Sequence, residues 1–339
     1  MKKTIGMLLV MIIIPCFTSC GIYKNSLYNE ALALIDEGDY LTSYEIMEGL
    51  NGYRDSEKYA DRFMFVPTMI TKNRNGEKSS ISFLYNEENL NTKIIETYSG
   101  GKTDCGEFTY DSHGRLISEV STDIYGKKST RKYSYDEYGN CIQIIETNAK
   151  GETQISTYTY GADGLTLKTK IAYFDGTESV QLFVHDDDGK LTSSGYNDSN
   201  GDYVIFDYQY DRNGNMTRIT ATHKPTGAQY SHAYTYDING NKIKHVYTKT
   251  SGKKEITNYT YNNAGWLIEE VYTSAEGEKS TYKYTYDTYG NPIKMVMKAD
   301  DGTNLIVDIE CKLVYIPYDL SDDIKEAQSV GFYVYGDLR

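Results

Sequence analysis

Oxygen-bearing side chains recur at alternate positions in three short stretches: Asp198-x-Asn200-x-Asp202, Asp211-x-Asn213-x-Asn215 and Asp237-x-Asn239-x-Asn241. Such carboxylate and amide oxygens could hold Ca²⁺, but a calcium loop of the helix–loop–helix kind needs glycine at its sixth position and a distal glutamate. Here glycine falls at the fourth position, where a tight turn requires it. We therefore expect turns at these stretches, and neither a metal site nor another cofactor, since CxxC pairs and clustered histidines are lacking.

Catalytic side chains follow no recognisable arrangement. The histidines are scattered over the chain: His113, His185, His223, His232 and His245. No serine or cysteine stands in a nucleophile motif. The sequence therefore predicts a protein that is not an enzyme.

Aromatic side chains offer another candidate chemistry, because the chain has 35 Tyr against nine Phe and one Trp. Tyr247, Trp266 and Tyr272 lie at even offsets in adjacent repeats, so they could share one face of a sheet. Tyr247 and Tyr272 would then be about 10 Å apart, two strands from each other. A flat aromatic row suits sugar rings, so these three are candidate ligand-binding residues. Ordinary packing of a tyrosine ladder is the alternative.

The elements that position these side chains follow a period of 25 residues. We take the second residue of each Tyr-x-Tyr or Phe-x-Tyr pair as an anchor: Tyr85, Tyr110, Tyr135, Tyr160, Tyr210, Tyr236, Tyr261 and Tyr286. His185 occupies the anchor position between Tyr160 and Tyr210. Two glycine series accompany the anchors, one running from Gly114 to Gly290 and the other from Gly101 to Gly302. Glycine at a fixed offset indicates a backbone position with positive φ, and hence a turn.

Each repeat therefore contains two turns and two strands. Segments such as "STYKYTY" (280–286) alternate as strands do, and their short connections make consecutive strands antiparallel neighbours. Roughly 20 strands are expected over 73–316, whereas open sheets seldom exceed about ten without curling. We predict a mainly β fold, an antiparallel β-hairpin repeat array that forms a long curled or spiral meander. The sequence leaves open which face the tyrosines occupy and whether the sheet closes.

The repeat resembles a known one. "FTYDSHGRLI" (108–117) and "YQYDRNGNMT" (208–217) are similar to the YD repeat, Y-x-Y-D-x-x-G-R/N, of the RHS/YD-repeat proteins. The resemblance covers about 80–315 in a short, degenerate array, in which Gly161 and Asn262 replace the aspartate. In that family long arrays wind into a shell around a C-terminal toxin, so the resemblance implies a β-spiral fold.

The first 19 residues are typical of an export signal, with Lys2 and Lys3 before an apolar run, Ile5–Ile14. That run is too short to span a bilayer, which takes roughly 20 residues. "FTSC" (17–20) resembles the lipobox of bacterial lipoproteins, which implies a lipid on Cys20. The protein would then be exported and anchored to the outer membrane or to the outer face of the cell membrane. An ordinary signal peptide is the alternative.

Three cysteines follow the signal: Cys105, Cys141 and Cys311. Two strands separate Cys105 from Cys141, which puts them about 14 Å apart. A disulfide tolerates only about 7 Å between Cα atoms. We therefore expect free thiols.

Residues 20–72 are predicted as a lipidated N-terminus and a helical neck, because Leu27, Ala31 and Leu34 have helical spacing. Gly38-x-Tyr40-x-x-Ser43 resembles the helix joint of a tetratricopeptide repeat (TPR). Such repeats need at least three units to bury a continuous core, so we expect a TPR-like spacer or end cap. Residues 317–339 are predicted as a C-terminal cap of a short helix and a strand.

The net charge of −13 and the isoelectric point near 4.9 argue against nucleic acid as a partner. We expect a lipid-anchored cell-surface protein that acts as a non-enzymatic interaction scaffold or adhesion module. Its partners would be the membrane, through Cys20, and an unknown protein or glycan. The alternatives are a polysaccharide-binding surface lipoprotein and an envelope partner of a toxin or secretion system.

Overall fold

The computed structural model describes residues 21–50, 53–60, 63–87 and 89–315. They fall into two compact units, one with residues up to 67, 85–90 and those from 311, the other with residues 68–84 and 91–310. The predicted signal peptide with Cys20 and the predicted C-terminal cap (317–339) lie outside the described residues. Within the described ranges, no helix has the length and apolar character to cross a bilayer.

The first unit contains the helices α1 (Gly21–Glu37), α2 (Tyr40–Gly49) and α3 (Ser56–Ala60). Gly38, with φ of 79°, ends α1, and the carboxylate of Asp39 accepts a hydrogen bond from the N–H of Thr42 to begin α2. The hydroxyl of Ser43 donates to the carbonyl of Ala31 at 2.8 Å. This bond joins the two helices at the Gly38–Ser43 stretch, in which the sequence resembles a TPR joint.

The helices pack around a small apolar core made of Tyr28, Ala31, Met47, Leu50 and Ala60. The helical segment is shorter than predicted, because residues 63–72, assigned to the neck, form most of the first strand, β1 (Phe63–Arg74). Two local features explain the difference. Pro67 disfavours a helix interior, and phenylalanine and isoleucine favour strands.

The other strands follow at the predicted period: β2 (Glu77–Tyr85), β3 (Asn91–Thr97), β4 (Thr103–Tyr110), β5 (Leu116–Thr122), β6 (Lys128–Tyr135), β7 (Cys141–Thr147), β8 (Thr153–Tyr160), β9 (Thr166–Ala172), β10 (Glu178–His185), β11 (Leu191–Asp198), β12 (Tyr203–Tyr210), β13 (Met216–His223), β14 (Ala228–Tyr236), β15 (Lys242–Thr248), β16 (Lys254–Tyr261), β17 (Leu267–Thr273), β18 (Lys279–Tyr286), β19 (Pro292–Ala299) and β20 (Asn304–Tyr315). The prediction of a mainly β, antiparallel hairpin array is confirmed.

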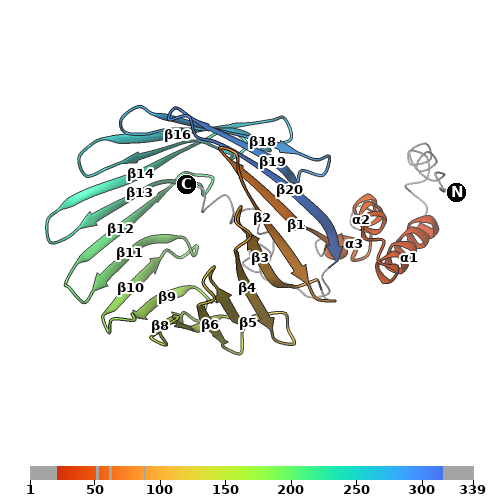
Figure 1. The fold of residues 1–339 in the computed structure, drawn as a ribbon, viewed down its shortest axis with the longest axis horizontal. Coiled ribbons are helices and arrows are strands. Elements are labelled where there is room, and N and C mark those ends of the chain that lie inside the picture. The colour runs from red at the N-terminus through yellow and green to blue at the C-terminus, as the bar shows by residue number, and fades with distance from the viewer. Residues whose placement is uncertain (1–20, 51–52, 61–62, 88, 316–339) are drawn as a thin grey trace. The chain divides into compact units, whose positions relative to one another are not determined.

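The sheet is closed rather than spiral. Each strand pairs with the next, and β1 also pairs with β20, so that the blue end of the sheet returns beside the orange one (Figure 1). At this seam the N–H of Asn75 donates to the carbonyl of Asn304 at 2.9 Å, and the Thr68 hydroxyl donates to the carbonyl of Glu310 at 3.1 Å. The predicted spiral meander is therefore wrong, and the question of closure, which the sequence left open, is answered by a closed sheet. Closure pairs the two strands that an open sheet would leave as edges.

The turns that directly follow the anchor positions are here called turns of the first kind, and those of the series from Gly114 to Gly290 have the predicted glycine at positive φ. In the turn after Tyr110, the N–H of Gly114 donates to the carbonyl of Asp111, and the N–H of Asp111 donates to the carbonyl of Arg115. Gly114 has φ of 76°, a conformation that glycine adopts without strain. The strand register shifts at Tyr110, as it does in the equivalent hairpins, so a bulge accompanies each turn of this kind.

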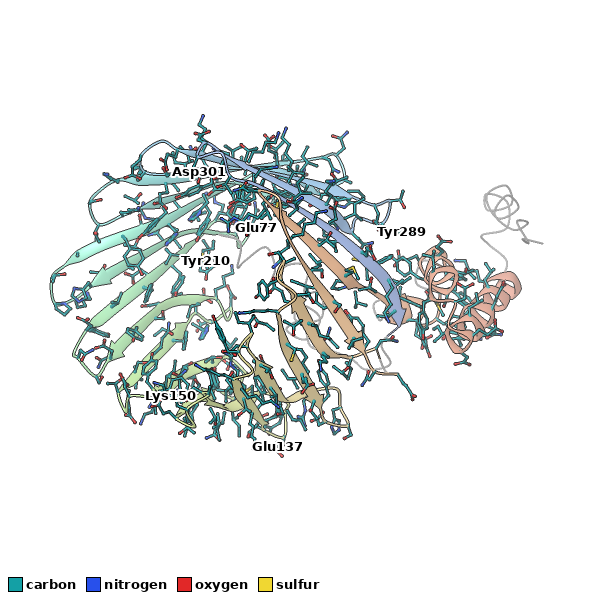
Figure 2. All side chains as sticks on the ribbon, viewed as in Figure 1. Glu77, Glu137, Lys150, Tyr210, Tyr289 and Asp301 are labelled. Carbon is teal, nitrogen blue, oxygen red and sulfur yellow. The ribbon has the colours of Figure 1, made fainter. Side chains whose placement is uncertain are left out.

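The turns of the second kind, which contain the glycine series from Gly101 to Gly302, are as tight as the first. The N–H of Gly126 donates to the carbonyl of Asp123, and the N–H of Asp123 donates to the carbonyl of Lys127. The carboxylate of Asp123 also accepts from the N–H groups of Tyr125 and Lys127, each at 2.9 Å. Figure 2 labels residues of both kinds of turn, Glu137 and Tyr289 in the first and Lys150 and Asp301 in the second.

The two faces of the closed sheet differ. The anchor tyrosines share one face, here called the tyrosine face, with most buried strand residues: Ile70, Ile81, Phe83, Ser179, Ser194, Ala221, Thr257, Tyr259, Glu270, Met295, Met297, Leu305 and Val307. Eight aliphatic side chains on the opposite face are 36–55% exposed: Ile117, Ile142, Leu167, Leu182, Val184, Ile243, Ile268 and Ile293. Side chains converge on the inside of a closed single-layer sheet, so the tyrosine face is the inner one.

Candidate binding surface

The anchor tyrosines connect each hairpin to the one before it. Their hydroxyls donate, at 2.6–2.9 Å, to backbone carbonyls at the start of the preceding odd-numbered strand or, for Tyr85, within β1: Tyr85 to Pro67, Tyr110 to Asn91, Tyr135 to Leu116, Tyr160 to Cys141, Tyr210 to Leu191, Tyr236 to Met216, Tyr261 to Lys242 and Tyr286 to Leu267. Each of these carbonyls except that of Pro67 lies beside a turn, where the two strands of a hairpin begin to separate. The anchor tyrosines thus have a structural role that fixes the shape of the inner face.

Burial perturbs the anchor phenols. It raises the pKa of Tyr110 and of Tyr135 from 10.0 to about 12, and it raises the pKa of Tyr286 as well. Burial disfavours the charged phenolate, so these hydroxyls remain protonated donors at neutral pH.

Tyr247 lies on the inner face within a group of rings on β14 and β15. Its ring is 4.7 Å from that of His232 and 14° from parallel, and the ring of Tyr230 meets it edge-on at 6.0 Å. Tyr272 shares the inner face, because it pairs with Thr257, and Thr257 is paired in the same ladder with His245. The predicted common face therefore holds for Tyr247 and Tyr272.

Trp266 lies apart from those two tyrosines. It ends a turn of the first kind, where its backbone N–H donates to the side-chain oxygen of Asn262. Its ring packs on that of Tyr286, with the ring centroids 5.4 Å apart. Tyr272 lies six residues further along the chain, at the other end of β17 and close to a turn of the second kind. At the rise of a strand, Trp266 and Tyr272 are therefore about 20 Å apart. The three candidate residues therefore do not form one aromatic row.

A pocket of about 350 Å³ opens on the inner face of β3–β6. Its lining includes Glu96, Asp104, Ser121, Lys127 and Ser129, so its walls carry carboxylates, hydroxyls and an ammonium group. Glu96 and Asp104 lie directly opposite each other in the ladder between β3 and β4. The hydroxyl of Tyr98 donates to the carboxylate of Asp104 at 2.8 Å, and Lys72 lies 3.2 Å from the carboxylate of Glu96.

Small residues line part of this pocket. Gly106 lies on the inner face between Asp104 and Phe108, and Ser121 and Ser129 face each other on the next two strands. At the position of Ser129 in its repeat, β14 carries Tyr230 instead. The pocket was not predicted from the sequence. The signal that could have pointed to it is Gly106 in the middle of a strand, since such a glycine often marks a close approach, here that of the Phe108 ring at 3.1 Å from where a Cβ would lie.

An ion network borders the pocket on the inner face. The guanidinium of Arg131 contacts the carboxylate of Glu146 at 2.9 Å and that of Glu119 at 3.6 Å. The hydrogen bond to Glu146 raises the pKa of Arg131, and the hydroxyl of Tyr133 donates to Glu119 at 3.2 Å. This side of the inner face is thus polar and its charges are paired.

The oxygen-rich stretches are turns. The carboxylate of Asp211 accepts from the N–H groups of Asn213 and Asn215, and that of Asp237 accepts from those of Asn239 and Asn241. Over the described ranges, no group of three or more His, Cys, Asp or Glu side chains could hold a metal ion. Cys105, Cys141 and Cys311 form no disulfide in this part of the chain.

The fold and this surface define a class of protein, a closed antiparallel sheet built from tyrosine-anchored hairpins. The family described as Teneurin YD-shell matches residues 61–183. This match confirms the predicted YD-repeat resemblance over residues 61–183. No match was found among curated proteins.

Solved structures that align with part of this chain include toxin complexes and a porin-like protein. The crystal structure of TcdB2-TccC3-Cdc42 is 13% identical with a TM-score of 0.35, and the alignment covers 73% of this chain and 16% of that one. The Photorhabdus luminescens Tc holotoxin pore is 13% identical with a TM-score of 0.28, covering 70% and 19%. A porin-like protein from Bacteroides uniformis is 13% identical with a TM-score of 0.36, covering 73% and 96%.

Proposed function

We propose that the protein is a lipid-anchored, non-enzymatic scaffold of the bacterial cell envelope, whose closed YD-repeat sheet binds a partner on its inner face. One observation carries this proposal. The inner face combines a series of fixed anchor tyrosines with a pocket of about 350 Å³ whose lining includes carboxylate and hydroxyl groups. This volume is in the range of ligand sites. The lipobox-like sequence before Cys20 supports anchoring to the envelope.

Two measurements test the proposal. Expression with a labelled fatty acid should label the wild-type protein and leave a Cys20→Ser variant unlabelled, since the thiol is the expected acceptor. A soluble fragment of residues 22–339 should capture a specific component from envelope extracts. Label on Cys20→Ser, or no specific capture, would contradict the respective part of the proposal.

Polysaccharide binding is the second candidate function, and the pocket favours it. Hydroxyls and carboxylates such as those of Ser121, Ser129 and Asp104 are groups that sugars use as hydrogen-bond partners. The pocket has room for a small saccharide, and Tyr98 stands beside it through its bond to Asp104. A toxin or secretion component in the capture experiment would instead favour a role as an envelope partner of such a system.

Filling the pocket tests the polysaccharide role. Ser129→Tyr places a tyrosine where β14 already carries Tyr230, so the sheet should accept it, and binding to a glycan array should be lost. Ser280→Tyr is the matched control, because Ser280 occupies the same place in the repeat outside the pocket. Equal glycan binding by both variants would rule out the pocket as the sugar site. Trp266→Ala and Tyr272→Ala test the aromatic residues in the same assay.

A further inference from the structure

Two histidines meet on the inner face where β14 pairs with β15. Nδ1 of His232 and Nε2 of His245 are 2.9 Å apart, which is hydrogen-bond distance. The two rings are 11° from parallel and their centroids are 5.1 Å apart. Because the nitrogens are much closer than the centroids, the rings meet end to end, with one nitrogen pointing at the other.

Tyrosine rings hold both imidazoles in place. The ring of Tyr247 lies 4.7 Å from that of His232, and the ring of Tyr234 lies 4.9 Å from that of His245, each within 14° of parallel. Their backbones pair in the same ladder, His232 with Tyr247 and Tyr234 with His245. The four rings therefore bridge the two strands as one unit.

The contact between the two nitrogens has room for one proton. A neutral imidazole has one N–H donor and one acceptor nitrogen, so one ring donates and the other accepts. If both rings are protonated, two N–H groups point at each other and two positive charges lie side by side. The hydrogen bond is then lost and the ends of the rings repel.

The residues directly opposite the two histidines on the outer neighbouring strands are uncharged. On β13 the residue opposite His232 is Ile219, and on β16 the residue opposite His245 is Thr257. The carboxylate in register on β16 is Glu255, which lies opposite Tyr247 and is paired with Lys249 at 2.5 Å.

Two further neighbours, Tyr230 and Lys242, carry no negative charge at neutral pH. Tyr230 contacts His232 edge-on at 6.1 Å and is a neutral phenol. Lys242 lies 5.9 Å from the ring centroid of Tyr234, so the nearby ammonium group is positive.

We propose that the His232–His245 pair is a pH-sensitive contact that holds β14 to β15 at neutral pH and weakens the closed sheet when the medium is acidified. This goes beyond the proposed scaffold function, since it assigns a response to conditions in the envelope. Histidine is the side chain that ordinarily titrates between about pH 5 and 8.

The sign of the effect follows from burial. Burial lowers the pKa of His232 below its ordinary value of 6.5. Above 6.5 the imidazole is neutral in both the folded and the unfolded chain, so the stability of the contact is fully present. As pH falls below that value, the unfolded chain takes up the proton first, and stability is lost until the lower folded pKa is reached.

Thermal unfolding of the full chain tests the proposal. Between about pH 7.5 and about pH 5.5, the melting temperature of the wild type should fall by about 2–4 °C more than that of His232→Gln. Glutamine can donate or accept at this place but does not titrate. His223→Gln is the matched control, because Nε2 of His223 faces the carboxylate of Asp202 at 3.0 Å rather than a second imidazole. Equal pH responses of wild type and His232→Gln would overturn the proposal.

A second measurement needs no variant at the pair. In wild-type protein carrying ¹³C-labelled histidine, the signals of His232 and His245 should titrate in a coupled manner, because the two nitrogens share one proton. Titration of the two signals as independent imidazoles would also overturn the proposal.

Discussion

At the scale of single residues, the anchor tyrosines have two tasks. The ring covers the inner face, and the hydroxyl satisfies a carbonyl of the preceding hairpin that the ladder leaves beside a turn. Phenylalanine could perform the first task but not the second. The repeat therefore prefers tyrosine at this position for a reason of hydrogen bonding.

Tyr135→Phe should reveal this second task. The hydroxyl of Tyr135 donates to the carbonyl of Leu116 at 2.6 Å, and its removal should lower the free energy of unfolding by about 1–2 kcal/mol. Denaturant titration measures the loss. Tyr138→Phe is the control, because Tyr138 lies in the next turn and is 84% exposed. Equal stability of the two variants would contradict the role of the hydroxyl.

Adjacent glycines allow a test of the turn conformation. Gly101 has φ of 75°, whereas Gly100 beside it does not adopt a positive φ, and both have open space where a Cβ would lie. Gly101→Ala should lower the free energy of unfolding by about 1–2 kcal/mol because of backbone strain alone. Gly100→Ala should be neutral or slightly stabilising, since it restricts the unfolded chain. Chemical denaturation of both variants measures the difference, and a similar loss in both would contradict this account.

Residue types alone predicted much at this scale. The glycine periodicity identified the turns, because a position with positive φ accepts few other residues. The pocket was not predictable in the same way. It forms where Gly106, Ser121 and Ser129 lie near one another on three strands, and the bulge beside Tyr110 sets part of that register.

At the scale of elements, the hairpin is the unit of construction, and its two turns differ less than their sequences do. Asp, Asn and Ser in the first place of a turn all accept N–H groups two and four residues on, as Asp123, Asn148 and Ser274 do. Turns that begin with Tyr98, Tyr173 or Lys249 make the same backbone bonds. The glycine with positive φ therefore sets the shared conformation, and the side-chain bond reinforces it where the first residue is Asp, Asn or Ser.

The seam between β1 and β20 gives an element-scale prediction. The N–H of Asn75 donates to the carbonyl of Asn304, and the N–H of Asn304 donates to the side chain of Asn75 at 2.7 Å. Strand amides at this seam should therefore exchange with solvent as slowly as those between β16 and β17, as hydrogen exchange read by NMR can measure. Rapid exchange of the amides of β20 that face β1 would indicate an open edge there.

Closure could not be derived from the repeats. The seam joins residues that are 229 positions apart, Asn75 and Asn304. Whether such ends meet depends on small twists summed over 20 strands, and a slight change in each decides between a spiral and a ring. Local patterns fix each hairpin but say little about that sum.

At the scale of the whole molecule, repeated interactions set the pH range over which the sheet is stable. On the acid side, a hydrogen bond from a side-chain amide lowers the pKa of Asp136, Asp211 and Asp237 from 3.8. A carboxyl with a lowered folded pKa stabilises the fold above its ordinary value, and this contribution is lost as pH falls below it.

At alkaline pH, the contribution of the buried tyrosines to stability changes in the opposite direction. Burial raises the pKa of Tyr110 and Tyr135 from 10.0 to about 12, so the fold keeps their contribution below pH 10.0 and loses it as pH rises toward 12. We expect cooperative unfolding in that window, accompanied by the ionisation of the anchor phenols. Circular dichroism and tyrosinate absorbance, followed together, measure it. Ionisation of all tyrosines near pH 10.0 with the sheet intact would contradict the role of burial.

The ring also restricts how its gene can change. An open array can gain or lose one copy of its repeat at either end without disturbing the rest. In a ring, deleting one hairpin would leave a gap of about 10 Å, two strand widths, that every remaining neighbour would have to absorb by tilting. Repeat number in this protein should therefore be inherited as a fixed trait, while single positions within the copies drift.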